Sequence, residues 1–198
     1  MPYKGMLMNK KIIIVTGCVA SGKTVFSSDL SHRLMISCFS KDTLKIALGK
    51  SLLHINGKEL SKATFNVMVH VMNELMQVGQ PLIIEGPFNN EDNRGKENEE
   101  KVIRSLVEKH GYRTLTFVFY GNMNTLYDRF IQRDQLPDRD SILRVNGLFD
   151  DIRFLKKINN PLKEFAIGET IMKVDTTDFK TVDFDKLMEA AYSFIYND

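Results

Sequence analysis

One stretch near the N-terminus constrains this chain more than any other: the octapeptide GCVASGKT at residues 17–24. It follows an apolar, β-branched run and precedes a segment with helical character. Glycines let the backbone wrap closely around a polyphosphate, so that successive N–H groups form an anion nest at the start of the helix. The lysine can reach the outer phosphates and the threonine hydroxyl can ligate Mg²⁺. This spacing predicts a nucleoside triphosphate site, rather than a turn without a ligand, formed by Gly17, Cys18, Val19, Ala20, Ser21, Gly22, Lys23, Thr24 and Val25.

The rest of the chain alternates short apolar runs with amphipathic segments. The apolar runs predict strands at 11–16, 36–40, 81–85, 114–120 and 170–174. Apolar periodicity and capping residues predict helices at 23–35, 43–48, 59–77, 97–109, 125–133 with Asn124 as cap, 141–157 with Ser141 as cap, and one starting at Asp183 or Asp185. Such alternation indicates an α/β fold with a parallel sheet covered on both faces. The loops that follow the strands then meet at one edge of the sheet, where ligands of open α/β sheets bind.

Size and charge limit the class of protein further. The 198 residues suit one domain, which we place at 11–198 after an N-terminal tail at 1–10. A net charge of +2 disfavours a nucleic-acid partner without excluding one. Two cysteines, Cys18 and Cys38, are too few for a disulfide framework, and no apolar run reaches the length of a membrane span. We therefore expect a cytoplasmic protein with free thiols and no membrane partner, either a monomer or a homodimer.

A series of short motifs resembles one family. After the phosphate loop come FSKD, which ends at Asp42, LIIEGPF at 82–88, FVFYG at 117–121, LYDRFIQR at 126–133 and VDTT at 174–177. The series is similar to that of the P-loop small kinases related to nucleoside monophosphate kinases, a group that includes polynucleotide kinases, zeta toxins, chloramphenicol phosphotransferase, and gluconate and shikimate kinases. The resemblance implies a three-layer αβα P-loop NTPase fold, strand order 2-3-1-4-5 and a short helical lid at 134–147. It also implies Mg²⁺-dependent transfer of the γ-phosphate of ATP to a hydroxyl group.

The resemblance also implies roles for two carboxylates. Asp42 matches the aspartate that acts as general base on the acceptor hydroxyl, and it can hold Mg²⁺ through water. The alternative for Asp42 is a cap of the helix beginning at Thr43. Glu85 matches an acidic residue with a magnesium-water role beside Thr24. A structural or substrate-binding role is the alternative for Glu85.

Arginines and the last loop complete the implied site. Arg133 matches the arginine where the lid begins, and it joins Lys23 and Asp42 as a predicted catalytic residue that stabilises charge on the transferring phosphoryl group. Arg129 lies one helical turn away and is predicted to contact the nucleotide, as is Thr176, whose loop lies near the adenine in relatives. Solvated surface arginines and a simple turn are the alternatives, and Arg139 and Arg144 are further candidates.

Three classes of function remain to be compared. The first is a kinase whose acceptor is a small-molecule hydroxyl, in a metabolite, an antibiotic or a nucleotide sugar, or else a polynucleotide 5′-hydroxyl. The second is a GTP-binding switch, which the absence of DxxG after the third strand and of NKxD disfavours. The third is a nucleotide-binding sensor or partner module without phosphotransfer. The charged segment 89–100 is interpreted as an exposed surface, with a substrate flap as the alternative.

Overall fold

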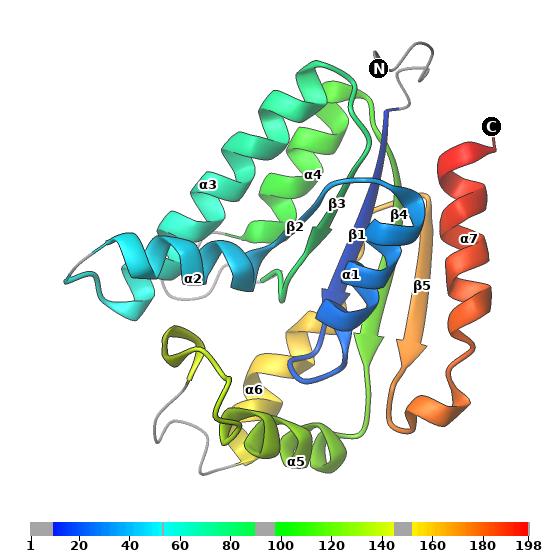
Figure 1. Cartoon of the computed structure of the whole chain (residues 1–198). Coiled ribbons are helices and arrows are strands. Elements are labelled where there is room, and N and C mark those ends of the chain that lie inside the picture. Colours follow the sequence, from blue (N-terminus) through cyan, green and yellow to red (C-terminus); the bar gives the residue numbers. More distant parts are fainter. Residues whose placement is uncertain (1–9, 53, 90–97, 145–151, 198) are drawn as a thin grey trace.

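A single parallel sheet forms the centre of the molecule (Figure 1). The computed structural model describes residues 10–52, 54–89, 98–144 and 152–197. All neighbouring strands are parallel, and their order is β2-β3-β1-β4-β5, as predicted. The strands are β1 (Lys11–Gly17), β2 (Cys38–Ser40), β3 (Leu82–Glu85), β4 (Arg113–Tyr120) and β5 (Thr170–Asp175).

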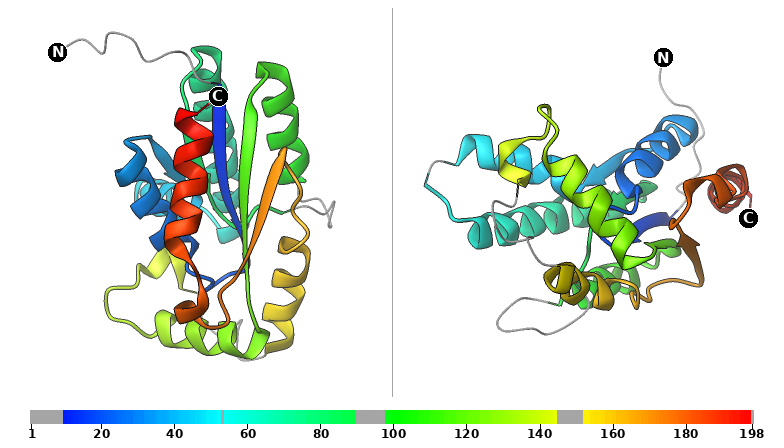
Figure 2. Two further views of the ribbon diagram at one scale, coloured as in Figure 1. Left: turned by 90° about the vertical axis from the view of Figure 1, so that its right-hand side faces the viewer. Right: turned by 90° about the horizontal axis from the view of Figure 1, so that it is seen from below.

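Helices cover both faces of this sheet, which gives the predicted three-layer αβα architecture (Figures 1 and 2). One face packs against α1 (Lys23–Leu34) and α7 (Phe184–Tyr196), and the other against α3 (Gly57–Gln77) and α4 (Glu99–His110). At the C-terminal side of the sheet lie α2 (Lys41–Ser51), α5 (Met123–Asp134) and α6 (Ile152–Leu162). Two 3₁₀ turns, η1 (Ser141–Leu143) and η2 (Phe179–Thr181), complete the described elements.

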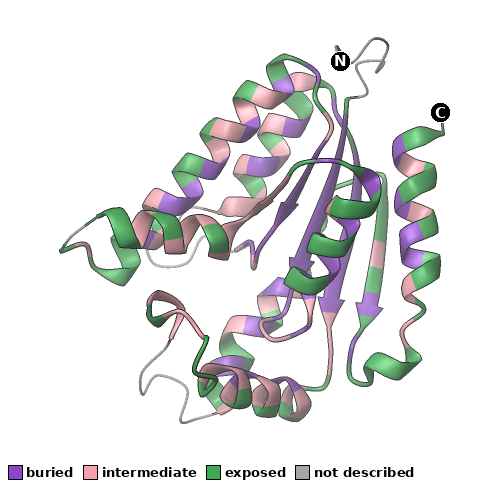
Figure 3. Cartoon of the chain, in the orientation of Figure 1, coloured by how far each residue is buried: buried purple, intermediate pink, exposed green. Residues whose placement is uncertain are grey.

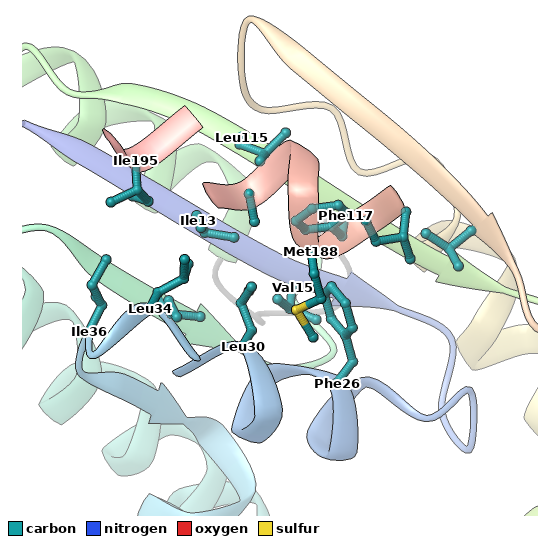
Figure 4. Close-up of a cluster of buried hydrophobic side chains, with 14 of the residues drawn as sticks. Ile13, Val15, Phe26, Leu30, Leu34, Ile36, Leu115, Phe117, Met188 and Ile195 are labelled. Carbon is teal, nitrogen blue, oxygen red and sulfur yellow. The ribbon is translucent and has the colours of Figure 1, made fainter. Parts of the chain in front are cut away.

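The central strand β1 explains why the sheet is buried on both sides. Every residue of β1 is buried, because alternate side chains enter separate cores (Figure 3). Ile13 and Val15 join the cluster beneath α1 and α7, where Phe26 packs edge-on against Phe117 at a ring-centroid distance of 5.1 Å (Figure 4). Ile12 and Ile14 pack under α3 and α4. The continuous apolar run in the sequence therefore corresponds to a strand with no solvent-facing side.

The parallel register brings the C-terminal ends of the strands together at one edge, the lower edge in Figure 1. Glu85 is level with Ser40 on one neighbouring strand and with Val15 on the other. On the far side, Gly17 is level with Phe119. The loops after the strands therefore lie side by side, as the sequence predicted.

The prediction of one helix at 141–157 is wrong for the residues described. Residues 141–143 form a single 3₁₀ turn, Arg144 is extended with a ψ of 136°, and α6 begins only at Ile152. Helix α6 also runs past the predicted end to Leu162, because a buried stripe of Leu155, Asn159 and Leu162 continues at helical spacing. Residues 145–151, which include the predicted end of the lid, lie outside the described residues.

Two predicted helix caps also differ. Asn122 rather than Asn124 caps α5, and its side chain accepts a hydrogen bond from the backbone N–H of Thr125. Asp140 rather than Ser141 caps η1. The last helix begins after Asp183, one of the two predicted starts. The predicted tail and most of the charged segment fall at 1–9 and 90–97, outside the described residues.

The thiols and the hydropathy of the helices bear on the remaining predictions. Cys18 is buried, Cys38 is half-buried, and both are free, as predicted. Burial raises the pKa of each thiol to about 11. In the described part of the chain, no helix combines the length and the apolar character that a membrane span requires.

Candidate functional site

The phosphate loop is a tight, left-handed turn between β1 and α1. Gly17, Ala20 and Gly22 have positive φ angles of 115°, 63° and 89°. At Gly17 a side chain is excluded, because a Cβ there would lie 2.1 Å from the carbonyl oxygen of Phe119 on β4. The backbone N–H of Cys18 donates to that same oxygen at 2.7 Å. Contact with β4 thus fixes the start of the loop.

Lys23 lies inside this loop. Its side chain is buried, and its Nζ donates to the carbonyl oxygen of Cys18, which also accepts from the hydroxyl of Ser21 at 2.6 Å. Burial lowers the pKa of Lys23, while the nearby Glu85 opposes this shift. Thr24 is exposed at the start of α1, and Val25 is 78% exposed. Because the Val25 side chain is apolar, this residue can offer a phosphate only its backbone N–H.

Glu85 closes β3 directly beside the loop. Its side chain is only 3% exposed, and one carboxylate oxygen accepts from the Ser40 hydroxyl at 2.7 Å. Burial raises the pKa of Glu85, and the charge of Lys23 and hydrogen bonds from Ser40 and Thr24 partly offset that effect. The predicted metal-binding pair Thr24 and Glu85 are therefore in contact.

Asp42 lies in the first turn of α2, on the same edge of the sheet. It is half-buried, and its charge acts on Lys23, Lys45 and Arg133. The alternative role as a helix cap is wrong, because Ser40 is the cap of α2 and its hydroxyl accepts from the N–H of Thr43 at 3.5 Å. Asp42 is therefore placed among the basic residues of the site without having to terminate the helix.

Arg133 enters the same space from the last turn of α5. Burial lowers its pKa, as does the charge of Arg139, while Asp42 and other acids oppose the shift. Its guanidinium lies 5.4 Å from the ring centroid of Phe130, and its Nε is buried without a hydrogen-bond partner. Lys23, Asp42, Glu85 and Arg133 therefore lie at one edge of the sheet, where the charges of the two acids raise the pKa of both Lys23 and Arg133 against the effect of burial.

Within the predicted lid, residues of the described part, 134–144, contact α2. Arg139 and Asp134 form an ion pair with an N–O distance of 3.6 Å, and Lys50 of α2 reaches Asp140 at 2.8 Å. Arg144 donates to the carbonyl oxygens of Leu136 and Arg139, so it is not a solvated surface arginine.

Arg129 and Thr176 meet at the loop after β5. The Arg129 guanidinium donates to the carbonyl oxygens of Thr176 at 2.6 Å and Thr177 at 3.0 Å, and it stacks 4.1 Å from the ring centroid of Phe179. The Thr176 hydroxyl points inward and donates to the carbonyl oxygen of Tyr120. Arg129 therefore supports this loop and is not a solvated arginine, whereas the side chain of Thr176 is committed to packing.

Sequence reasoning missed two residues that contact the phosphate loop. A Cβ added at Gly22 would lie 2.9 Å from the Phe179 ring, so this ring covers the start of α1. From the opposite side, Asn159 of α6 accepts a hydrogen bond from the backbone N–H of Val19 at 2.8 Å. Phe179 lies in a segment interpreted only as a turn. Asn159 shares the buried stripe of α6, which is the signal that could have revealed it.

The oxygen atoms of three side chains at this edge suit Mg²⁺ that phosphates and water also coordinate, rather than a metal ion bound by protein ligands alone. The Thr24 hydroxyl and the carboxylates of Glu85 and Asp42 are hard ligands, the kind that Mg²⁺ takes in small number while phosphates and water supply the rest. Within the described ranges, no cluster of three or more histidine, cysteine, aspartate or glutamate side chains could hold a metal.

Comparisons with known proteins support the fold. No family model matches the chain, and no curated protein matches it significantly. A solved structure from Chloroflexus aurantiacus with a provisional kinase assignment shares 21% identity and a TM-score of 0.74, with 96% of this chain and 97% of that one covered. A gluconokinase from Sinorhizobium meliloti (12% identity, 94% and 91% covered) and a shikimate kinase from Acinetobacter baumannii in complex with shikimate (16%, 93% and 92%) each give a TM-score of 0.56. The chain thus has the P-loop small-kinase fold, as the motifs predicted.

Proposed function

We propose that this protein is an ATP-dependent kinase that transfers the γ-phosphate to a hydroxyl group of a small molecule, with Mg²⁺. The observation that carries this proposal is the meeting of Lys23, Asp42 and Arg133 at one edge of the sheet. A nucleotide-holding module needs only the loop and its lysine. A carboxylate whose charge acts on the same lysine and an arginine from the last turn of α5 are the additional parts that phosphoryl transfer requires.

The residues present fit a triphosphate and its metal ion. The loop has positive φ angles at Gly17, Ala20 and Gly22, as turns that form anion nests require, and the buried Nε of Arg133 is an unsatisfied donor. Thr24 and Glu85, with Asp42 beside them, would hold Mg²⁺ directly or through water. Mg²⁺ would neutralise phosphate charge in the bound state.

Each residue then has a defined task in the reaction. Asp42 accepts the proton of the acceptor hydroxyl as its oxygen forms a bond to the γ-phosphorus. The bond between the γ-phosphorus and the bridging oxygen breaks, and ADP leaves with the electron pair. Lys23 and Arg133 stabilise the negative charge on the transferring group and on the leaving oxygen. The loop after β5, supported by Arg129, would border the nucleoside.

The acceptor itself would bind between α2, α3 and the loop after β3. Lys41 of α2 forms an ion pair with Glu99 there, and its ammonium lies 5.4 Å from the ring centroid of Phe65 and 5.9 Å from that of Phe88. This pair ties α2 to α4 beside Asp42. A metabolite, an antibiotic and a nucleotide sugar all remain acceptors for the proposal, with a polynucleotide 5′-hydroxyl as a further alternative.

The decisive experiment separates binding from transfer. Asp42→Asn should bind ATP·Mg²⁺ within about twofold of the wild type, since it leaves the loop intact, but lose about 10²- to 10⁴-fold of the transfer rate because the general base is gone. Transfer would be measured as ADP release with a panel of hydroxyl-bearing metabolites, with Asp128→Asn on the exposed side of α5 as control. Normal transfer by Asp42→Asn would show that the base is another group.

The alternative of a sensor module without phosphotransfer makes a different prediction. Such a protein would bind ATP·Mg²⁺ yet release no ADP with any acceptor in the panel, and Asp42→Asn would change neither property. The electrostatic coupling of Asp42 to Lys23 favours the kinase, because a sensor has no need of a base at that position.

A further inference from the structure

A buried asparagine on α6 contacts the outer side of the phosphate loop. Asn159 has no exposed surface, and its Oδ1 accepts a hydrogen bond from the backbone N–H of Val19 at 2.8 Å. Its backbone carbonyl is 3.6 Å from the Sγ of Cys18, which donates to it. Its Nδ2 faces the Sδ of Met123 at 3.8 Å. One residue of α6 therefore holds two consecutive residues of a loop 140 positions earlier in the chain.

The loop needs such support at this place. Ala20, the residue after Val19, has a φ of 63°, in the left-handed region that disfavours any side chain with a Cβ. The glycines of the loop adopt positive φ without this penalty, but Ala20 does not. A strained residue persists only where its surroundings hold it. The hydrogen bond from Val19 to Asn159 lies before Ala20, and the bond from the Ser21 hydroxyl to Cys18 spans it.

The same asparagine connects the loop to the helices beneath it. Cys18 is buried in a small cluster with Leu126 and Phe130 of α5 and Leu155 of α6, and Val19 and Ala20 pack against its rim. Helix α5 carries Arg129 and Arg133. The outer side of the phosphate loop and the arginine-bearing helix therefore share one core, and Asn159 contacts residues of that core, Cys18 and Met123.

We propose that Asn159 is a positioning residue that holds the phosphate loop in its binding conformation through the N–H of Val19. The inference depends on the proposed nucleotide site, and it adds a residue that touches neither nucleotide nor acceptor. Without the amide, the Val19 N–H is left unpaired in a half-buried place, and the turn at Ala20 relaxes. Ligand binding must then also order the loop, and the entropy lost in that ordering lowers the affinity for polyphosphate.

The test compares two neighbouring asparagines. Asn159→Leu removes the acceptor while keeping the branched shape and the number of side-chain heavy atoms, whereas Asn160→Leu makes the same change at the exposed next position. By calorimetry, Asn159→Leu should weaken the binding of both ATP·Mg²⁺ and Mg²⁺-tripolyphosphate about tenfold, since one hydrogen bond is lost. Asn160→Leu should bind like the wild type. The effect on tripolyphosphate is the diagnostic result, because this probe has no nucleoside and so measures the phosphate-binding part of the site alone.

A measurement on the wild type guards against a variant that fails to fold. Hydrogen exchange should show the Val19 amide protected, and Asn159→Leu should release it while the amides of β1 keep their protection. Wild-type protein that binds neither probe would refute the proposed function. Wild-type binding combined with an unchanged affinity in Asn159→Leu, or an unprotected Val19 amide in the wild type, would overturn the role of Asn159 alone.

Discussion

Glu85 shows how a single residue in the site makes stability depend on pH. Burial raises its pKa above the ordinary value of 4.5, so the folded chain holds this proton more tightly than the unfolded chain. Between pH 4.5 and the raised pKa the folded state therefore carries more protons, and the free energy of unfolding falls as pH rises. Ionisation of Glu85 therefore lowers the stability of the folded chain, as expected for a carboxylate whose place is set by ligand binding rather than by folding.

Glu85→Gln should remove this pH dependence. The amide keeps the shape and can still accept from Ser40, but it does not titrate. Urea unfolding of both proteins from pH 4 to pH 8 would show the wild type losing stability relative to the variant as pH rises. Glu108→Gln, at an exposed position of α4, should keep the wild-type profile. A constant difference between Glu85→Gln and wild type at every pH would contradict the assigned cause.

The sequence predicted which residues gather at the site because their places depend only on the ends of parallel strands. Glu85 ends β3, Asp42 lies two residues after β2, and Lys23 begins the helix that follows the loop after β1, so the fold class was enough to bring them to one edge. Asn159 and Phe179 come from elements whose position depends on packing. The only signal for Asn159 is its place in the buried stripe of α6, and Phe179, an aromatic residue in a turn, carries no local signal of the loop that it contacts.

At the scale of elements, β1 lies too close to β4 at Gly17 to leave room for a side chain. A Cβ there meets backbone atoms of Phe119 rather than a flexible side chain, and the φ of 115° is strained for any other residue. The two strands would have to separate where the phosphate loop begins. The end of β1 and the start of the loop thus depend on a glycine at position 17.

Gly17→Ala should lower the free energy of unfolding by about 3 kcal/mol, the sum of overpacking and backbone strain. Gly57→Ala is the matched control, because a Cβ at that first position of α3 has open space and alanine favours a helix. Chemical denaturation of the two variants would give the comparison. Equal stabilities would mean that β4 yields easily at this point and that the close contact does not fix the loop.

The prediction of one helix at 141–157 failed because the apolar spacing continues across two separate elements. Apolar residues at 142, 152 and 155 fit one continuous helix, but the structure has η1, an extended Arg144 and a later start of α6 at Ile152. The lid contacts explain the first part, since η1 packs on α2, where Ile142 lies against Gly49. Tertiary contacts of this kind outweigh the weak preference of a short segment for helix.

For the whole molecule, the site is the place where separately stabilised parts meet. The sheet carries one core on each face, and the phosphate loop rests on a third, smaller core with α5 and α6. A ligand that contacts the loop, α2 and Arg133 together would add contacts between parts that different cores hold. Binding should therefore stabilise the fold as a whole, in proportion to the affinity of the ligand.

Heating the protein with nucleotide measures this linkage. A ligand at about 100 times its Kd adds about 2.7 kcal/mol, which for a chain of this length raises Tm by about 5–10 °C. We expect that rise with ATP·Mg²⁺, and none with ATP·Mg²⁺ for Lys23→Met, which fills the same space without the charge that meets the phosphates. Val67→Met, an exposed apolar position on α3, should respond like the wild type. A rise with GTP·Mg²⁺ and none with ATP·Mg²⁺ would contradict the proposed nucleotide, because the chain would then have the ligand preference of a switch protein rather than that of an ATP-dependent kinase.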